Sequence, residues 1–421
     1  MARSQYFFII SVLISTTQGQ VFHLANMYAD EMVLQMEPKS AHIWGWGEPG
    51  SQVTVTLDLQ QISVSISNAE GKWSARLPPQ PAGGPRTLGF EYEPQSGLTE
   101  TLNLAVYFGD VWVCSGQSNM EMQLREIFNA TEEIEIAATY TNIRILKLSQ
   151  ITSDVELDEL NGTAIPWSRI DTMNIPNFSA ACVLYGERMS DGLGGTRPIG
   201  LIEASWPGTR IEATNRNADN VLWNGMIHPL TALAVRGAVW YQGENNVGYN
   251  ENFYACHIQH LVSDWAKTFV DGTVPAENGL AFPFGIFQLG PSDPGSDSKW
   301  GFIRWHQTVD SGALPNTFIP EAFIAVESIT VTSPGVVKLS YDSDIFVQAF
   351  AGFSYQLPTG EWIATDINSV SGRDVTVTFD PTATHLAYAW ESTVCEYKEC
   401  AIYSADAEVL PAPVWLWSLT N

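Results

Sequence analysis

Between residues 107 and 327, short apolar runs alternate with longer amphipathic stretches, and this alternation restricts the fold more than any other feature. Two of the longer stretches, Ala180–Met189 and Phe253–Phe269, have the length and apolar spacing of helices. Such alternation is typical of a parallel sheet with helices on both faces, which places the chain in the α/β class. The candidate strands are Val111–Cys114, Ile143–Leu148, Ile199–Ala204, Ala238–Tyr241, Phe284–Leu289 and Phe323–Val326.

The segments on either side of this region lack a helical period. In residues 20–106, β-type runs at 41–47 and 53–57 are separated by Gly- and Pro-rich turns, which predicts a small β-sandwich. After residue 328, the runs 336–340 and 374–379 alternate with period two, which predicts a second β-domain over 328–421. We therefore expect an N-terminal β-domain, a central α/β domain over 107–327 and a C-terminal β-domain.

The N-terminus and the charge suggest where the protein works. Residues 1–19 combine Arg3, an apolar core and small residues near the end, as in a secretory signal peptide, and no later apolar stretch is long enough for a membrane span. Secretion agrees with three acceptor triplets for N-glycosylation, which begin at Asn129, Asn161 and Asn177. The formal net charge of −26 argues against nucleic acid as a partner. The expected location is secreted or lysosomal.

The five cysteines leave at least one thiol unpaired. Cys395 and Cys400 bracket four residues and are the candidate disulfide. Cys114 lies in a predicted central strand, where we expect a buried, reduced thiol. The spacing of the cysteines and histidines predicts no metal site, and the expected chemistry needs no cofactor.

The pentapeptide Gly116–Met120 is the strongest candidate for chemistry. It follows the apolar run Val111–Cys114 and precedes Glu121–Phe128, which predicts a helix. A serine on a strand-to-helix turn is exposed at a sheet edge, beside helical N–H groups that favour negative charge. This geometry suits Ser118 as an acyl-transfer nucleophile. The alternative is that Ser118 only caps the helix.

Two further strands end in polar residues. The run that ends at Ser205 leads into Gly208, and the run that ends at Tyr241 leads into Gln242 and Asn246. Ligands of open parallel sheets bind at the carboxyl ends of the strands, so these residues are expected near Ser118. Gly208 offers a backbone N–H to an oxyanion, and Gln242 or Asn246 offers a side-chain amide. The alternative is that the glycines simply end the strands.

Several segments resemble the sialate O-acetylesterases of the SGNH hydrolase superfamily. The segments are 32–35, 111–120 (VWVCSGQSNM), 198–202 (PIGLI), 222–230 (LWNGMIHPL), 239–244 (VWYQGE), 303–308 (IRWHQT), 388–390 and 395–400. This resemblance spans nearly the whole chain after the leader. It implies an SGNH-type domain that removes O-acetyl groups from sialic acids, with Ser118 as nucleophile, Gly208 and Gln242 in the oxyanion hole, and Asn246 at the pocket. Another acetylated glycan, such as xylan, is the alternative substrate, and a non-catalytic sialoglycan-binding protein is the alternative function.

The family's general base is the feature that this sequence lacks. The resemblance implies a late Asp/His block, yet residues 316–326 lead directly into a segment that resembles the C-terminal β-region. His306 is the candidate substitute base, and His385 is the other late histidine that follows an aspartate. Loss of a triad member costs about four to six decades in rate. We therefore expect an ester-binding crevice with little or no esterase activity, and the jump suggests a skipped exon or an incomplete gene model.

Two arginines are candidates for binding the carboxylate of a sialic acid. Arg210 follows Gly208 by two residues, at a position where the family usually carries proline, and Arg304 lies in the 303–308 segment. A guanidinium pairs with a carboxylate through two parallel hydrogen bonds. The alternative for Arg210 is a solvent-facing side chain.

Overall fold

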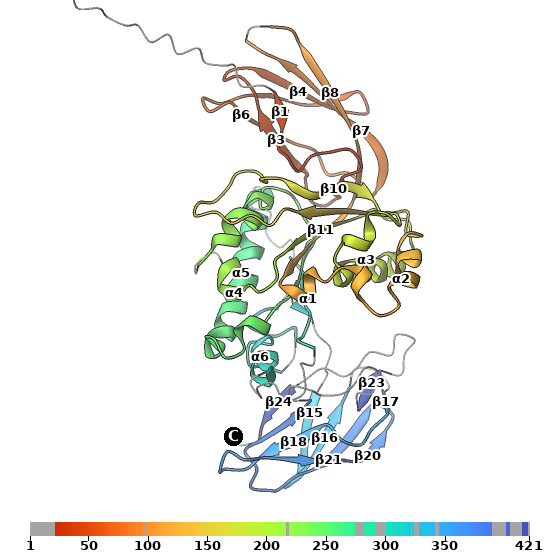
Figure 1. The fold of residues 1–421 in the computed structure, drawn as a ribbon, viewed down its shortest axis with the longest axis vertical. Helices are drawn as coiled ribbons and strands as arrows, with labels where there is room; N and C mark the ends of the chain where they lie inside the picture. The colour runs from red at the N-terminus through yellow and green to blue at the C-terminus, as the bar shows by residue number, and fades with distance from the viewer. Residues whose placement is uncertain are drawn as a thin grey trace, which may run out of the picture.

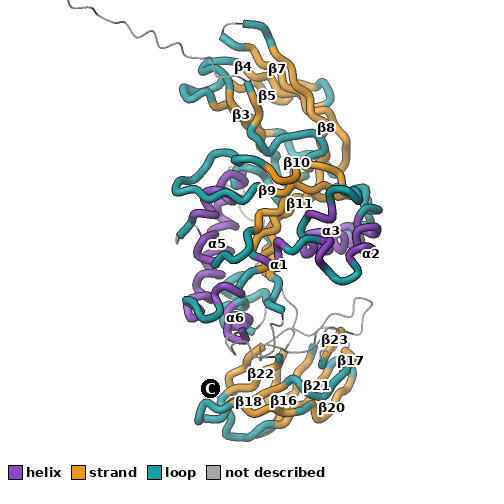
Figure 2. Tube along the Cα trace, viewed as in Figure 1, coloured by secondary structure: helices purple, strands orange, loops and turns teal. Residues whose placement is uncertain are grey.

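A computed structural model describes residues 22–95, 97–215, 219–273, 282–290, 300–312, 314–320, 322–323, 328–341, 345–389, 401–404 and 415–419. The predicted signal peptide and the Cys395–Cys400 pair lie outside these residues. Three parts follow one another along the long axis: N-terminal strands, a central part with helices, and C-terminal strands (Figures 1 and 2). Among the described residues, no helix is both long and apolar enough to span a membrane.

The central sheet has the strand order β10-β9-β11-β8-β12-β13-β14. Its members from β9 to β14 pair in parallel, as the alternating pattern predicts. The edge strand β10 is antiparallel to β9, and sequence analysis missed it because Pro166 and two register shifts interrupt its pattern. The bounds are β8 (Glu100–Gly116), β9 (Ile143–Leu148), β10 (Thr163–Arg169), β11 (Ile199–Ser205), β12 (Gly237–Tyr241), β13 (Phe284–Ile286) and β14 (Ala322–Phe323).

Helices lie on both sides of this sheet, with α2 and α3 on one side and α4 and α5 on the other (Figure 1). In α5 (Tyr254–Thr273), the buried side chains recur at the spacing of a single helical face. These are Tyr254, Ile258, Leu261, Val262, Trp265 and Phe269. The remaining helices are α1 (Ser118–Glu121), α2 (Ala130–Ala137), α3 (Ala180–Gly192), α4 (Ile211–Thr214) and α6 (Trp300–His306).

The helix expected over Glu121–Phe128 is not continuous. The helix α1 begins at Ser118 and ends at Glu121, and a separate 3-10 turn, η1, covers Leu124–Glu126. Between them Gln123 is extended and forms an isolated antiparallel bridge with Ser179. The Leu124 N–H donates to the Phe178 carbonyl at 3.0 Å. This pairing with the start of α3 satisfies backbone groups that a longer helix would have used, so the helix prediction is wrong there.

The N-terminal part has a separate antiparallel sheet of β1, β3 and β6, while β2, β4, β5 and β7 extend the central sheet through β8, with β2 parallel to it. The first half of β8 pairs with β7, and the second half, from Asp110 to Gly116, pairs with β11. One strand therefore runs through the boundary expected at residue 106. The other strands are β1 (His23–Leu24), β2 (Val33–Gln35), β3 (His42–Trp46), β4 (Gln52–Leu57), β5 (Gln60–Ile66), β6 (Lys72–Arg76) and β7 (Gly83–Glu93).

The C-terminal part is built of strands alone in the described residues, and its sheets enclose an apolar core of their own. The expected runs 336–340 and 374–379 correspond to β16 (Val336–Ser340) and β21 (Asp374–Thr378). The others are β15 (Ser328–Ser333), β17 (Ile345–Val347), β18 (Phe353–Gln356), β19 (Trp362–Thr365), β20 (Ile367–Ser371), β22 (His385–Tyr388), β23 (Ile402–Ser404) and β24 (Trp415–Ser418).

A disulfide joins Cys114 of β8 to Cys182 in the first turn of α3, with 5.8 Å between the Cα atoms. The expectation that Cys114 is a reduced thiol is therefore wrong. Both residues belong to the apolar core between the sheet and α3, so the packing of this helix brings the two sulfurs together. Among the described residues, Cys256 is a free, exposed cysteine.

Candidate active site

Ser118 lies where β8 passes into α1, at the carboxyl edge of the central sheet. Gly116 has a φ of +144°, and a Cβ atom there would lie 2.0 Å from the Tyr241 carbonyl oxygen. Only glycine allows strands β8 and β12 to approach so closely before the turn. The Ser118 side chain is exposed, whereas Gln117 beside it is buried. The turn thus presents the Ser118 hydroxyl to solvent, as the sequence predicts.

Gly208 belongs to the turn that follows β11, the strand next to β8. The register pairs Ser205 with Gly116, and the Trp206 N–H donates to the Gly116 carbonyl at 3.0 Å. Gly208 is exposed and adopts a φ of +71°. Among the described residues, neither the Gly208 N–H nor the Ser118 N–H has a protein acceptor. Two free backbone donors at neighbouring strand ends are what an oxyanion requires.

A buried network of side-chain amides joins the three strand ends. The Gln242 Nε2 atom lies 3.0 Å from Gln117 Oε1, 2.8 Å from Asn246 Oδ1 and 3.3 Å from the Thr209 carbonyl oxygen. The Tyr254 hydroxyl lies 2.9 Å from both the backbone and the side-chain oxygen of Gln242, and its one hydrogen is shared between them. The network fixes the turn of Gly208 against the turn of Ser118.

This geometry differs from the expectation for Gln242 and Asn246. Both side chains are buried, with 1% and 0% of their surface exposed. The amide hydrogens of Gln242 face acceptors within the protein, and Asn246 donates to Glu212 Oε2 at 2.9 Å. The structure therefore places both as positioning residues beneath the site, rather than as donors that face an oxyanion directly.

Glu244 and Asn119 complete this side of the site. The Asn119 amide, one residue after Ser118, donates to Glu244 Oε1. Burial raises the pKa of the Glu244 carboxyl above its usual range, because the charged form loses solvation there. Glu244 is the last residue of the 239–244 segment, and the sequence alone did not indicate that its carboxyl is buried beside Ser118's neighbour.

All seven histidines lie in described segments, and the contacts of His306, His385 and His257 there are with groups other than Ser118. His306 Nδ1 lies 2.5 Å from Asp310 Oδ1, four residues later along the chain. His385 contacts the Thr384 hydroxyl at 3.1 Å, within the C-terminal strands. His257 lies 3.9 Å from Glu212, and no cluster of metal-ligating side chains forms within the described residues. Within the described residues, the Ser118 hydroxyl accepts a hydrogen bond from the neutral Gln117 amide at 3.4 Å.

The two candidate arginines have different surroundings. The Arg210 guanidinium lies over the Tyr249 ring, 3.4 Å from its centroid, and remains exposed. Arg304 is fully buried and donates to the carbonyls of Leu289, Gly290 and Ala389, each at 3.0 Å. Burial lowers the pKa of Arg304 to about 10. Arg304 thus ties α6 to the C-terminal strands, and the expectation that it binds a substrate carboxylate is not supported by this position.

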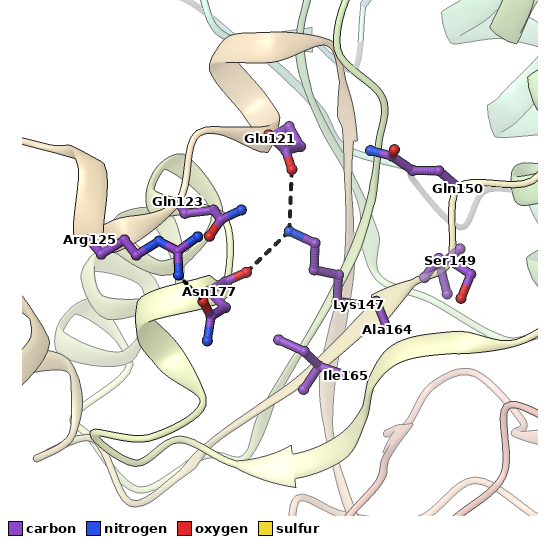
Figure 3. Close-up of a pocket in the computed structure, with 10 residues that line it drawn as sticks. Glu121, Gln123, Arg125, Lys147, Ser149, Gln150, Ala164, Ile165 and Asn177 are labelled. Carbon is purple, nitrogen blue, oxygen red and sulfur yellow. Dashed lines mark hydrogen bonds and ion pairs between the residues drawn. The ribbon is translucent and has the colours of Figure 1, made fainter.

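A pocket of about 540 Å³ lies beside α1, at the carboxyl end of β9. Lys147 extends into it, and its Nζ atom lies 3.7 Å from Glu121 and donates to the Asn177 carbonyl at 3.1 Å (Figure 3). The same Nζ atom is 2.9 Å from the buried Glu203 carboxylate. Lys147 and Glu203 are register partners on neighbouring strands. The lining residues are Glu121, Gln123, Arg125, Lys147, Leu148, Ser149, Gln150, Ala164, Ile165 and Asn177.

The three predicted glycosylation sites are all exposed, and one of them shares this pocket. Asn129 and Asn161 lie away from its lining, whereas the Asn177 Oδ1 atom accepts a hydrogen bond from Arg125 at 2.6 Å. The Ser179 hydroxyl, which belongs to the same acceptor triplet, is buried as the N-cap of α3. Glycosylation itself stays a prediction for all three.

Two family models match the chain. A carbohydrate esterase model for sialic acid-specific acetylesterases matches residues 108–276, and a sialate O-acetylesterase C-terminal domain matches residues 330–419. The human sialate O-acetylesterase is 34% identical, with 96% of this chain and 94% of the relative covered, and the mouse protein is 31% identical, with 98% and 97% covered. The chain belongs to the sialate O-acetylesterase family. The fold is also that of a crystallised carbohydrate acetylesterase from Xanthomonas citri, with a TM-score of 0.76, 23% identity, and 95% and 100% of the chains covered.

The family alignment shows that relatives contain residues that this chain lacks. The alignment with the human protein runs over 499 residues, of which this chain supplies about 404, or 96% of its 421, so roughly 95 positions have no counterpart here. The two matched models leave residues 277–329 between them. The expected gap near residues 326–329 falls within this interval.

Proposed function

We propose that this chain binds O-acetylated sialic acids at Ser118 and hydrolyses the acetyl ester slowly, as an SGNH-type hydrolase. The observation that carries the proposal is the exposed Ser118 hydroxyl beside the free N–H groups of Ser118 and Gly208. Membership of the sialate O-acetylesterase family supplies the substrate class. On this proposal, residues 107–327 form the hydrolase domain between two β-domains.

The reaction has two steps. The Ser118 oxygen attacks the acetyl carbonyl carbon, and the two N–H groups hold the resulting oxyanion. The sugar oxygen leaves with a proton as an alcohol, and the acetyl group remains on Ser118 as an ester. Water then attacks this ester, releases acetate and restores the hydroxyl.

Proton transfer limits both steps. The candidate bases His306 and His385 contact Asp310 and Thr384, and the Ser118 hydroxyl lies beside the neutral Gln117 amide. On this proposal, water accepts the Ser118 proton. Loss of the general base costs about four to six decades in rate, and the oxyanion hole with substrate binding retains the remaining acceleration.

The test is the release of acetate from O-acetylated N-acetylneuraminic acid and the hydrolysis of 4-nitrophenyl acetate. We expect slow turnover that Ser118→Ala abolishes. Turnover unchanged in Ser118→Ala would place the chemistry elsewhere. A kcat of about 10 s⁻¹, which is ordinary for enzymes, would show that a base is present, and His306→Ala and His385→Ala would then identify it.

A non-catalytic role is the second candidate, because His306 contacts Asp310 and His385 contacts Thr384, rather than Ser118. On this alternative, the crevice binds an acetylated sialoglycan without hydrolysis. Binding of the acetylated sugar, with no Ser118-dependent acetate release over days, would favour this candidate over slow hydrolysis.

We also propose that the protein is secreted or lysosomal. The Cys114–Cys182 disulfide supports this proposal, because such bonds persist in oxidising compartments. The N-terminal sequence and the exposed acceptor triplets agree with it. Localisation of a C-terminally tagged chain in expressing cells would test it, and retention in the cytosol would contradict it.

A further inference from the structure

The pocket beside α1 adjoins both parts of the ester site. Glu121 lines it and lies one helical turn after Ser118, about 5 Å along the helix axis. On another wall, Gln150 donates to the carbonyl of Ser205 at 3.3 Å, where β11 ends before the Gly208 turn. A sugar whose acetyl group reaches Ser118 thus has this pocket beside it. The volume of about 540 Å³ is that of an ordinary small-ligand site.

The two cations of the pocket differ in their partners. Lys147 faces two carboxylates, at 2.9 and 3.7 Å, which neutralise its charge. Arg125 is exposed, and its recorded partner among the described residues is the neutral Asn177 amide, at 2.6 Å from Nη1. In a chain with a net charge of −26, Arg125 is therefore an uncompensated positive charge at the wall of a pocket.

We infer that this pocket is the sugar subsite and that Arg125 binds the carboxylate of the sialic acid. The inference rests on the proposed function and adds the residue that distinguishes an acidic sugar from a neutral one. Asn177 holds the guanidinium through Nη1, which leaves the edge formed by Nε and Nη2 for a carboxylate. That edge makes two parallel hydrogen bonds, a geometry that a lysine does not reproduce.

Arg210 is the competing residue. It lies on the other side of the site, in the segment after Gly208, and its guanidinium face is stacked on Tyr249. Arg125 lines a concave volume that a sugar ring can occupy, and Arg210 is not among the residues that line this pocket. The test therefore compares variants of Arg125 with a variant of Arg210.

The test measures binding of the methyl glycoside of N-acetylneuraminic acid and of its carboxamide to the full chain, by ligand-detected NMR titration. The carboxamide has the same shape without the charge. We expect the acid to bind at least tenfold more tightly, and Arg125→Gln to remove that preference. Arg125→Lys should keep only part of it. Arg169→Gln is the matched control, because Arg169 is exposed and lies outside the pocket lining. Thermal unfolding of each variant verifies folding.

The other outcomes overturn the inference, each in a distinct way. Equal binding of acid and carboxamide would show that the pocket takes a neutral glycan. A preference that survives Arg125→Gln but disappears in Arg210→Gln would move the carboxylate to Arg210. If neither sugar binds while acetate release still depends on Ser118, the inference fails and the proposed function stands. If acetate release is also independent of Ser118, both fail.

Discussion

Lys147→Met tests the buried ion pair that supports the site. Glu203 has 1% of its side chain exposed, and its carboxylate accepts hydrogen bonds from Lys147, the Ser179 N–H and the Ser205 hydroxyl, each at 2.9 Å. Methionine keeps the apolar stem of the lysine but leaves the carboxylate without a cation. Removal of one partner of a buried pair costs about 3–5 kcal/mol of unfolding free energy, because the remaining charge is uncompensated.

The loss should depend on pH, and its sign follows from the pKa of Glu203. Burial raises this pKa in the folded state, and loss of the Lys147 charge raises it further. The folded chain then binds more protons than the unfolded chain above the unfolded pKa of about 4.3, so the unfolding free energy falls as pH rises. The extra loss should therefore be larger at about pH 7.5 than at about pH 5, with a slope of at most about 1.4 kcal/mol per pH unit.

The assay is urea unfolding of the parent, Lys147→Met and Lys147→Met/Glu203→Gln at both pH values. The double variant should recover most of the loss at the higher pH, because it removes the unpaired charge. A single variant within about 0.5 kcal/mol of the parent, an equal loss at both pH values, or a double variant no better than the single one would refute this reasoning.

Three further predictions follow from single contacts. Arg304→Met should lower the unfolding free energy by about 3 kcal/mol or more, measured by urea unfolding, because two buried carbonyls and one half-buried carbonyl lose a charged donor. A change below about 1 kcal/mol would contradict this. Tyr254→Phe should lower the unfolding free energy by about 1–3 kcal/mol and also lower the Ser118-dependent rate of acetate release, because the hydroxyl holds the amide network in place. Unchanged stability and an unchanged rate would argue against that role. Peptide mapping of the secreted chain should find Cys114 linked to Cys182. It should find glycans at Asn129 and Asn161 but not at Asn177, because a glycan on Asn177 would fill the pocket. A glycan on Asn177 would count against the sugar subsite.

The parallel sheet could be predicted from the sequence because its strands are buried on both faces. Such strands appear as short, nearly continuous apolar runs, as in Ile199–Ala204. The carboxyl ends of neighbouring parallel strands lie at the same sheet edge, which places Ser118 beside Gly208. The edge strand β10 and the broken helix after Glu121 could not be predicted, because tertiary pairing decides both.

The roles of individual polar side chains were harder to predict. A sequence gives the residue type at a strand end but not whether its amide faces the ligand or another amide, and the network around Gln242 is made of such internal bonds. The sequence does contain a feature that predicts the buried ion pair. Lys147 and Glu203 are opposite charges within two otherwise apolar strands. The Cys114–Cys182 bond had no comparable signal, because 68 residues separate its ends.

Mass spectrometry of the chain after exposure to a fluorophosphonate tests the central claim most directly, because the probe reports both the position of the serine and its activation. The account predicts one adduct, on the peptide that carries Ser118, formed slowly and absent from Ser118→Ala. Rapid labelling would contradict the absence of a base, and labelling at another residue, or none at Ser118 after prolonged exposure, would contradict the assignment of the site.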